Sequence, residues 1–81
     1  MSNTVVEFGD LLCGYKHLGI DWNDANNILA NDRIYPFHEP KEFHKSDFGA
    51  SNPYEFCDST LALIRYFLET HPDITYFTVV P

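Results

Sequence analysis

Apolar residues recur at helical spacing over the first part of the chain. The recurring positions are Val5, Phe8, Leu11, Leu12, Tyr15 and Leu18. Thr4 followed three residues later by Glu7 matches a capping box, in which the two side chains satisfy amides at a helix start. We therefore favour a helix that begins near residue 4 and ends at Gly19, a residue suited to a left-handed stop. The alternative is a short strand over residues 4–8, because adjacent valines favour strands.

A second helix is predicted to start at Asp21, which is a good N-cap residue, with Asp24 in its first turn. Its apolar side consists of Trp22, Ala25, Ile28 and Leu29. Trp22 is expected to belong to the core. The first two predicted helices together suggest a helical hairpin. A DNA-reading helix-turn-helix is disfavoured, because the second helix carries no basic residue before Arg33.

The middle of the chain predicts extended and irregular structure. Residues 33–38 form a β-like run interrupted by Pro36, which restricts the run to an edge strand or an extended loop. Residues 39–53 are polar and rich in Pro, Gly, Ser and Asn, a composition typical of a long surface loop.

The last part predicts a helix followed by a strand. A helix is expected over residues 60–70, capped by Asp58 or Ser59 and stopped by Pro72, with apolar groups around most of its surface. Residues 74–80 are β-branched and aromatic and predict a strand. One strand cannot stand alone, so it must pair with the 33–38 run, with the amino terminus or with another subunit. The fold class expected is α+β and mostly helical, with three helices, a long central loop and a C-terminal strand.

Composition indicates one folded, acidic domain. The chain has 81 residues and a net charge of −7, yet it is 16% aromatic. Disordered acidic chains are poor in aromatic residues, so this chain is expected to fold, as a single domain over residues 1–81. It has no secretory signal pattern and no apolar run long enough to span a membrane, which makes a cytoplasmic setting the simplest expectation.

The charges indicate the class of partner. The cations, Lys16, Arg33, Lys41, Lys45 and Arg65, are scattered singly. Nucleic acid and anionic membranes need clustered Lys and Arg, so neither is expected as a direct ligand. A basic protein surface is the electrostatic complement of this chain. The alternative is that the acidity serves only solubility.

Residues with catalytic or metal-binding chemistry form no recognisable motif. Cys13 and His17 would share one face of a helix, and His38, His44 and Cys57 are the remaining residues considered as ligands, but no paired-ligand motif is present. Neither cysteine lies in a nucleophile signature, and no phosphate-binding glycine motif occurs. We therefore expect no metal, no cofactor and no enzymatic activity.

A contact function has more support in the sequence. The net charge is −4 over residues 1–32, zero over residues 33–48 and −3 over residues 49–81, while aromatic residues cluster in the neutral segment. Aromatic anchors beside a charged rim suit a protein interface. The predicted partner-binding residues are Asp21, Asp24, Asp32, Tyr35, Phe37, Phe43, Phe48 and Glu69. The alternative for the aromatic residues of this region is that several of them fold inward and pin the loop.

Two functions fit this surface. The first is a stoichiometric inhibitor that occupies the nucleic-acid groove of a basic partner and imitates phosphate charge. In general character the chain is similar to small proteins of phages and mobile elements, such as anti-CRISPR, anti-restriction and nuclease-immunity proteins. The second is an assembly subunit that forms a homodimer or larger homo-oligomer through its terminal strand and its apolar third helix.

Overall fold

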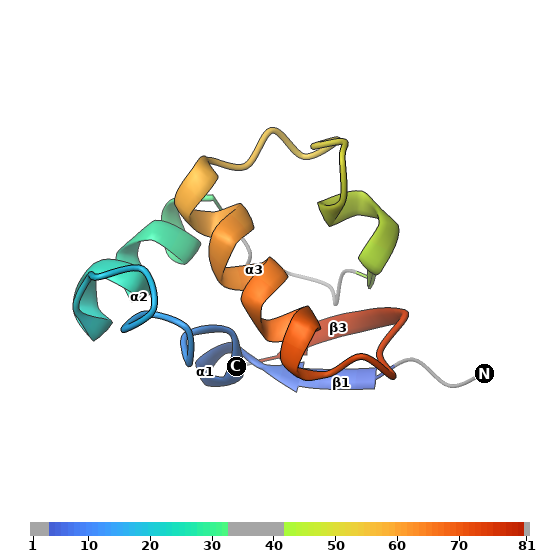
Figure 1. Ribbon diagram of the computed structural model, residues 1–81, viewed down its shortest axis with the longest axis horizontal. Coiled ribbons are helices and arrows are strands. Elements are labelled where there is room, and N and C mark those ends of the chain that lie inside the picture. Colours follow the sequence, from blue (N-terminus) through green and yellow to red (C-terminus); the bar gives the residue numbers. More distant parts are fainter. Residues whose placement is uncertain (1–3, 33–41, 81) are drawn as a thin grey trace.

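The computed structural model describes residues 4–32 and 42–80 of the chain. In chain order the elements are β1 (Thr4–Glu7), α1 (Phe8–Leu11), α2 (Trp22–Asn31), β2 (Glu42–His44), the 3₁₀ helix η1 (Lys45–Phe48), α3 (Asp58–Thr70) and β3 (Tyr76–Val80). In Figure 1, α3 crosses one face of a small sheet, α2 lies at one end of the molecule, and α1 lies beside the sheet. The fold is therefore a mixture of helices and a mixed sheet, and the predicted α+β class is confirmed.

The C-terminal strand is the centre of the sheet. The strand order is β1-β3-β2, with β1 parallel and β2 antiparallel to β3. Phe77 lies opposite both Thr4 and Phe43, and Val79 lies opposite Val6. Side chains at paired positions point to the same face, so these residues share the face that α3 covers. The ring of Phe67 on α3 lies 6.4 Å from that of Phe77, which confirms the contact between helix and sheet.

The other face of the sheet carries mixed side chains. Val5, Thr78 and Glu42 share one row on this face, and Tyr76 lies opposite His44 in the next row. Val5 is 67% exposed, whereas Val6, one position later, is 2% exposed. This alternation is the signature of a strand with one face on the core.

The predicted first helix is wrong over residues 4–7, which form β1 instead. The helix begins only at Phe8, where the backbone amide of Glu7 donates to the carboxylate of Asp10 at 3.3 Å, and it lasts a single turn. The physical reason is tertiary: β3 needs a partner strand, and the β-branched valines of β1 supply it. Of the partners proposed for the terminal strand, the amino terminus is therefore confirmed.

Turns replace the rest of the predicted first helix, over residues 12–19. Gly14 is buried in these turns, and a Cβ there would lie 2.7 Å from the Tyr66 ring. A residue with a Cβ at position 14 would therefore clash with α3 at this close approach. Gly19 has a φ of 75° and ends the turns, which confirms its predicted left-handed conformation. The Cys13 and His17 pair therefore does not lie on a regular helix.

The second helix is confirmed, including its cap. The carboxylate of Asp21 accepts a hydrogen bond from the backbone amide of Asp24 at 2.8 Å. Ala25 and Leu29 are the buried residues of α2. The core position predicted for Trp22 is wrong, because its side chain is 50% exposed. Trp22 is the first residue of the helix, so no preceding turn of α2 lies under its side chain.

The prediction of a long irregular loop over residues 39–53 is wrong in part. Residues 42–44 form β2 and residues 45–48 form η1 within the segment predicted to be irregular. Phe43 causes the difference, since it is fully buried against Phe77 with ring centroids 5.6 Å apart. The predicted edge strand over residues 33–38 lies outside the described residues.

The third helix and the C-terminal strand are confirmed, with corrected bounds: β3 begins at Tyr76 rather than at residue 74. α3 begins two residues earlier than predicted, and its N-cap residue is Cys57 rather than Asp58 or Ser59. Six of its residues are buried: Thr60, Leu61, Leu63, Ile64, Phe67 and Leu68. In the described part of the chain, no helix combines the length and the apolar character that crossing a membrane requires.

Candidate partner-binding surface

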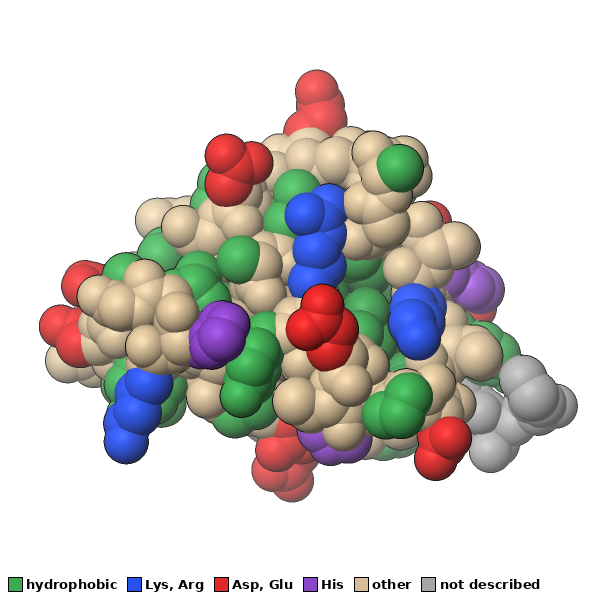
Figure 2. All heavy atoms as spheres, in the orientation of Figure 1, with side chains coloured by type: hydrophobic (Ala, Val, Ile, Leu, Met, Phe, Trp, Pro, Cys, Tyr) green, Lys and Arg blue, Asp and Glu red, His purple; other side chains and the backbone are tan. Residues whose placement is uncertain are grey.

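Most acidic side chains of the described residues lie at the surface, and few described cations accompany them. Over the described residues there are eleven carboxylates and three Lys or Arg side chains. Nine of the carboxylates are exposed, and the other two, Asp32 and Asp47, are partly buried. On the face in Figure 2, most acidic side chains lie toward the outline of the molecule and one lies near its middle, so they do not gather in one patch. The described residues contain one ion pair, between Glu42 and His44.

Part of this acidity stabilises the starts of helices. Besides the Asp21 cap of α2, Asp10 accepts a hydrogen bond from the amide of Glu7, and Asp47 accepts one from the amide of His44, both at 3.3 Å. Carboxylates at helix N-termini satisfy amides that have no partner within the helix. Asp21, a predicted partner-binding residue, is therefore exposed but already has a structural role.

Asp32 links two helices that are distant in sequence. Its carboxylate accepts a hydrogen bond from the backbone amide of Cys57, the N-cap residue of α3, at 2.9 Å. Partial burial acts to raise the pKa of Asp32, but hydrogen bonds from Thr60 and Cys57 to the carboxylate outweigh it, and the pKa is lowered. Asp32, which was predicted to bind a partner, therefore lies at the end of α2 and caps the start of α3.

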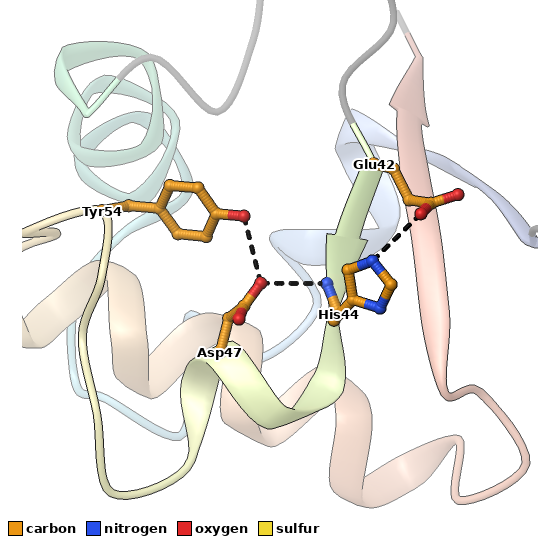
Figure 3. Close-up of polar contacts among 4 residues, drawn as sticks. All are labelled: Glu42, His44, Asp47 and Tyr54. Carbon is orange, nitrogen blue, oxygen red and sulfur yellow. Dashed lines mark hydrogen bonds and ion pairs between the residues drawn. The ribbon is translucent and has the colours of Figure 1, made fainter.

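Asp47 anchors the segment that follows β2, as Figure 3 shows. Its carboxylate accepts a hydrogen bond from the Tyr54 hydroxyl at 3.0 Å in addition to the one from the His44 amide. Burial, and next the hydrogen bond and the charge of Asp47, raise the pKa of Tyr54. The His44 imidazole points the other way, with its Nε2 atom 3.0 Å from Glu42. These contacts fix the geometry of the loop.

Glu69 lies beside positive charge. It lines a surface hollow of about 510 Å³ together with Lys45 and Arg65, over an apolar floor that includes Phe48 and Leu68. Arg65 donates to the carbonyl oxygens of Phe48 at 2.6 Å and of Gly49 at 2.8 Å, which holds η1 against α3. Two of the three described cations therefore line the same hollow as Glu69, although no ion pair between described residues joins either of them to it. Of the predicted acidic residues, Asp24 is the one whose carboxylate is exposed with neither a capping role nor a cation recorded beside it.

The prediction that Phe43 and Phe48 belong to the interface is wrong, because both side chains are buried. Phe43 is 0% exposed and Phe48 is 2% exposed, so neither side chain presents a contact surface. Both pack in an aromatic cluster with Tyr54, Phe56 and Phe77 at centroid distances of 5.3–6.4 Å. Packing into the core removes their large apolar area from water, and an exposed loop position would forfeit that gain. The inward-folding alternative holds for these two residues. Tyr35 and Phe37 lie outside the described residues.

Two apolar residues at the surface were not predicted there. Trp22 and Val5 are the large hydrophobic residues that stay exposed in the described part of the chain. Trp22 lies between Asn23 and the cap residue Asp21, and Asp24 follows in the same turn. A sequence signal existed for Trp22, since acids flank it at a helix start, where side chains project away from the helix body. The aromatic residue beside exposed acids is thus Trp22.

The residues considered for metal binding do not come together. Among the described residues, no group of three or more His, Cys, Asp or Glu side chains is placed to hold a metal ion. His17 packs against Tyr66 with a centroid distance of 4.9 Å, and both cysteines are free and exposed. Burial, followed by the charge of Asp10, raises the pKa of Cys13, which works against a reactive thiolate. His38 lies outside the described residues.

Comparison of the chain with protein-family models, with curated proteins and with solved structures gives no significant match. A proposal for the function must therefore start from the chemistry of the surface. That surface offers an exposed indole beside carboxylates, and a net negative charge that few cations offset.

Proposed function

We propose that this protein is a binding module that acts stoichiometrically on a basic partner protein, through a surface centred on the start of α2. The observation that carries the proposal is the half-exposed side chain of Trp22, with Asp21 and Asp24 in the same turn. Tryptophan is enriched among the residues that dominate binding energy at protein interfaces. Carboxylates around such an anchor orient a partner of opposite charge.

The partner class follows from the charge balance. With eleven carboxylates against three Lys or Arg side chains in the described part of the chain, the protein attracts basic surfaces and repels phosphates. Proteins that handle nucleic acids carry extended basic grooves, because those grooves must bind phosphates. We propose that this chain occupies such a groove and thereby competes with the nucleic acid, as an inhibitor of the anti-CRISPR or nuclease-immunity kind.

The test starts with the full chain immobilised and exposed to lysate of the cells that carry its gene. The captured protein is then titrated with the chain while its bound, labelled nucleic acid is monitored. The expected result is displacement at a fixed stoichiometry, with an affinity that falls as salt rises, because salt screens exposed charges. Capture of an acidic or neutral protein, or binding that is indifferent to salt, would contradict the proposal.

Two variants locate the surface. Trp22→Ala is expected to weaken binding by about 30-fold or more, the loss that truncation of a central interface residue causes. Asp24→Lys is also expected to weaken binding, because an attractive contact becomes repulsive. The loss of affinity that it causes should grow as the salt concentration is lowered. Asp73→Lys is the matched control, since Asp73 is an exposed acid near the end of the chain, distant in sequence from the start of α2. Equal effects of Asp24→Lys and Asp73→Lys would show that net charge alone matters.

A further inference from the structure

The outer edge of β1 is available for strand pairing. β3 occupies the centre of the sheet, and β1 has β3 on one side and no strand of the described residues on the other. An edge strand presents backbone N–H and C=O groups that can template a further strand. Folded proteins commonly protect such edges with charge, proline or a covering segment. Val5 of β1 lies on the face of the sheet opposite α3, and its side chain is 67% exposed.

A hollow runs along this edge. Its volume is about 410 Å³, and its lining includes Thr4, Val5 and Val6 of β1, Asp10 and Cys13 after it, and Ile74 before β3. Three consecutive residues of one strand can line one hollow only if the hollow follows the strand edge, because successive side chains point to opposite faces. Phe67 and His71 of the α3 end also line it, so the lining combines backbone, apolar side chains, a thiol, one imidazole and one carboxylate.

The charge beside the edge is negative. Residues 4–15 contain two carboxylates, Glu7 and Asp10, and no Lys or Arg, and both carboxylates are exposed. The thiol of Cys13 in the same hollow adds a small neutral group. A second copy of this chain is a poor occupant, because it would bring a second acidic edge, on a protein of net charge −7, against the first. An extended segment that carries Lys or Arg is the complementary occupant.

The edge of β2 is a weaker candidate. β2 has three residues, and Glu42 on it is already paired with His44 at 3.0 Å. Lys45 follows directly, so a basic segment would meet a cation there. The two edges therefore differ in charge, and β1 is the acidic one.

We infer that β1 accepts an extended, Lys- or Arg-bearing segment of a partner protein as a fourth strand of the sheet. This inference rests on the proposed function for the class of partner, and it adds a mode of binding and a second contact surface. The backbone of Thr4, Val5 and Val6 supplies the main-chain hydrogen bonds, because the amide of Glu7 already donates to the carboxylate of Asp10. The side chains of Glu7 and Asp10 select basic side chains in the added strand.

The test uses a defined probe, a short peptide of alternating lysine and valine with blocked ends, added to the isotope-labelled full chain. At about 1 mM peptide we expect chemical-shift changes at Thr4–Glu7, Asp10, Cys13 and Ile74, and slower amide exchange in β1. The same peptide with alternate backbone nitrogens methylated is expected to bind about tenfold or more weakly, because methylation removes its hydrogen-bond donors. Shift changes elsewhere, no change at this concentration, or equal binding of the methylated peptide would overturn the inference.

Variants separate this edge from general acidity. Glu7→Gln is expected to weaken peptide binding, whereas Asp58→Asn, at the far end of α3 from the sheet edge in Figure 1, is expected to leave it unchanged. The proposed function can fail separately. If Glu7→Gln leaves capture of the basic partner intact while Trp22→Ala abolishes it, the function stands and the β1 inference falls. If the peptide pairs with β1 but no basic partner is captured, the edge stands and the function falls.

Discussion

The carboxylate of Asp32, at the end of α2, accepts a hydrogen bond at 2.9 Å from the backbone amide of Cys57, at the start of α3. The two residues are 25 positions apart, so one helix supplies the cap of another. Cys57 itself makes no side-chain cap bond, and the first amides of α3 otherwise lack a partner of this kind. This contact joins α2 to the helix that covers the sheet.

Removal of this cap is expected to destabilise the fold. Asp32→Ala should lower the free energy of unfolding by about 1–2 kcal/mol, the usual cost of losing a side-chain cap. The folded pKa of Asp32 is lowered, so its contribution is complete above the unfolded pKa of about 3.9 and is lost as pH falls through the folded value. Urea denaturation of the two proteins should therefore converge at acid pH. A difference that persists well below the folded pKa would contradict the capping role.

The Arg65 clamp on η1 gives a second prediction. Arg65→Met should cost about 1–3 kcal/mol of unfolding free energy, since two carbonyl oxygens, those of Phe48 and Gly49, lose a charged donor. Arg65→Lys should recover only part of this loss, because an ammonium group cannot present two donors in a planar fork. Denaturant titration measures both variants.

Lys45→Met is the control for this prediction, because it removes a cation from the same hollow with no hydrogen bond recorded for its side chain. It should change stability by no more than about 0.5 kcal/mol. If Lys45→Met costs as much as Arg65→Met, the stabilisation comes from positive charge near Glu69 and not from the two carbonyl contacts.

The elements that sequence predicted well are those that local residues determine. α2 follows from its Asp21 cap and the spacing of Ala25 and Leu29, and α3 follows from a dense apolar pattern. β1 and β2 are short and depend on pairing with β3, which the sequence does not place beside them. Val5 and Val6 fit either a helix stripe or a strand, and only the presence of β3 decides between the two.

The candidate surface, like the fold, was predicted in part: the exposure of most carboxylates was predicted correctly and the positions of several aromatic residues were not. Nine of the eleven described carboxylates, Asp24 among them, are exposed, so residue type alone predicts most of this exposure. Aromatic residues have no such default. Phe43 is buried because it faces Phe77 across the sheet, whereas Trp22 is exposed because it begins a helix. The cap of α3 by Asp32 was also missed, since contacts across 25 residues leave no local pattern.

Glu55 carries a strained backbone that can be relieved. Its φ is 58°, in the region that favours glycine, and Asn52 holds the turn through two hydrogen bonds to the backbone of Phe56, at 2.8 and 3.0 Å. Glu55→Gly is expected to raise the free energy of unfolding by about 0.5–1 kcal/mol, the relief of strain less the extra chain entropy of glycine. Thermal and urea denaturation measure the gain. Glu55→Ala removes the carboxylate but keeps the Cβ, so it should bring no gain; an equal gain would assign the effect to charge instead.

The exposed tryptophan offers a direct test of the acidic environment at the start of α2. Trp22 is the single tryptophan, so intrinsic fluorescence reports this position alone. Because Trp22 is 50% exposed with Asp21 and Asp24 in its turn, quenching by caesium, relative to its quenching of a free neutral tryptophan derivative, should exceed the same ratio for iodide at low salt. Asp24→Asn should narrow the difference between the two quenchers, and Asp73→Asn should leave it unchanged. If the two ratios are equal in the unaltered protein, the carboxylates do not act on the indole, and the basis for its selecting a basic partner is lost.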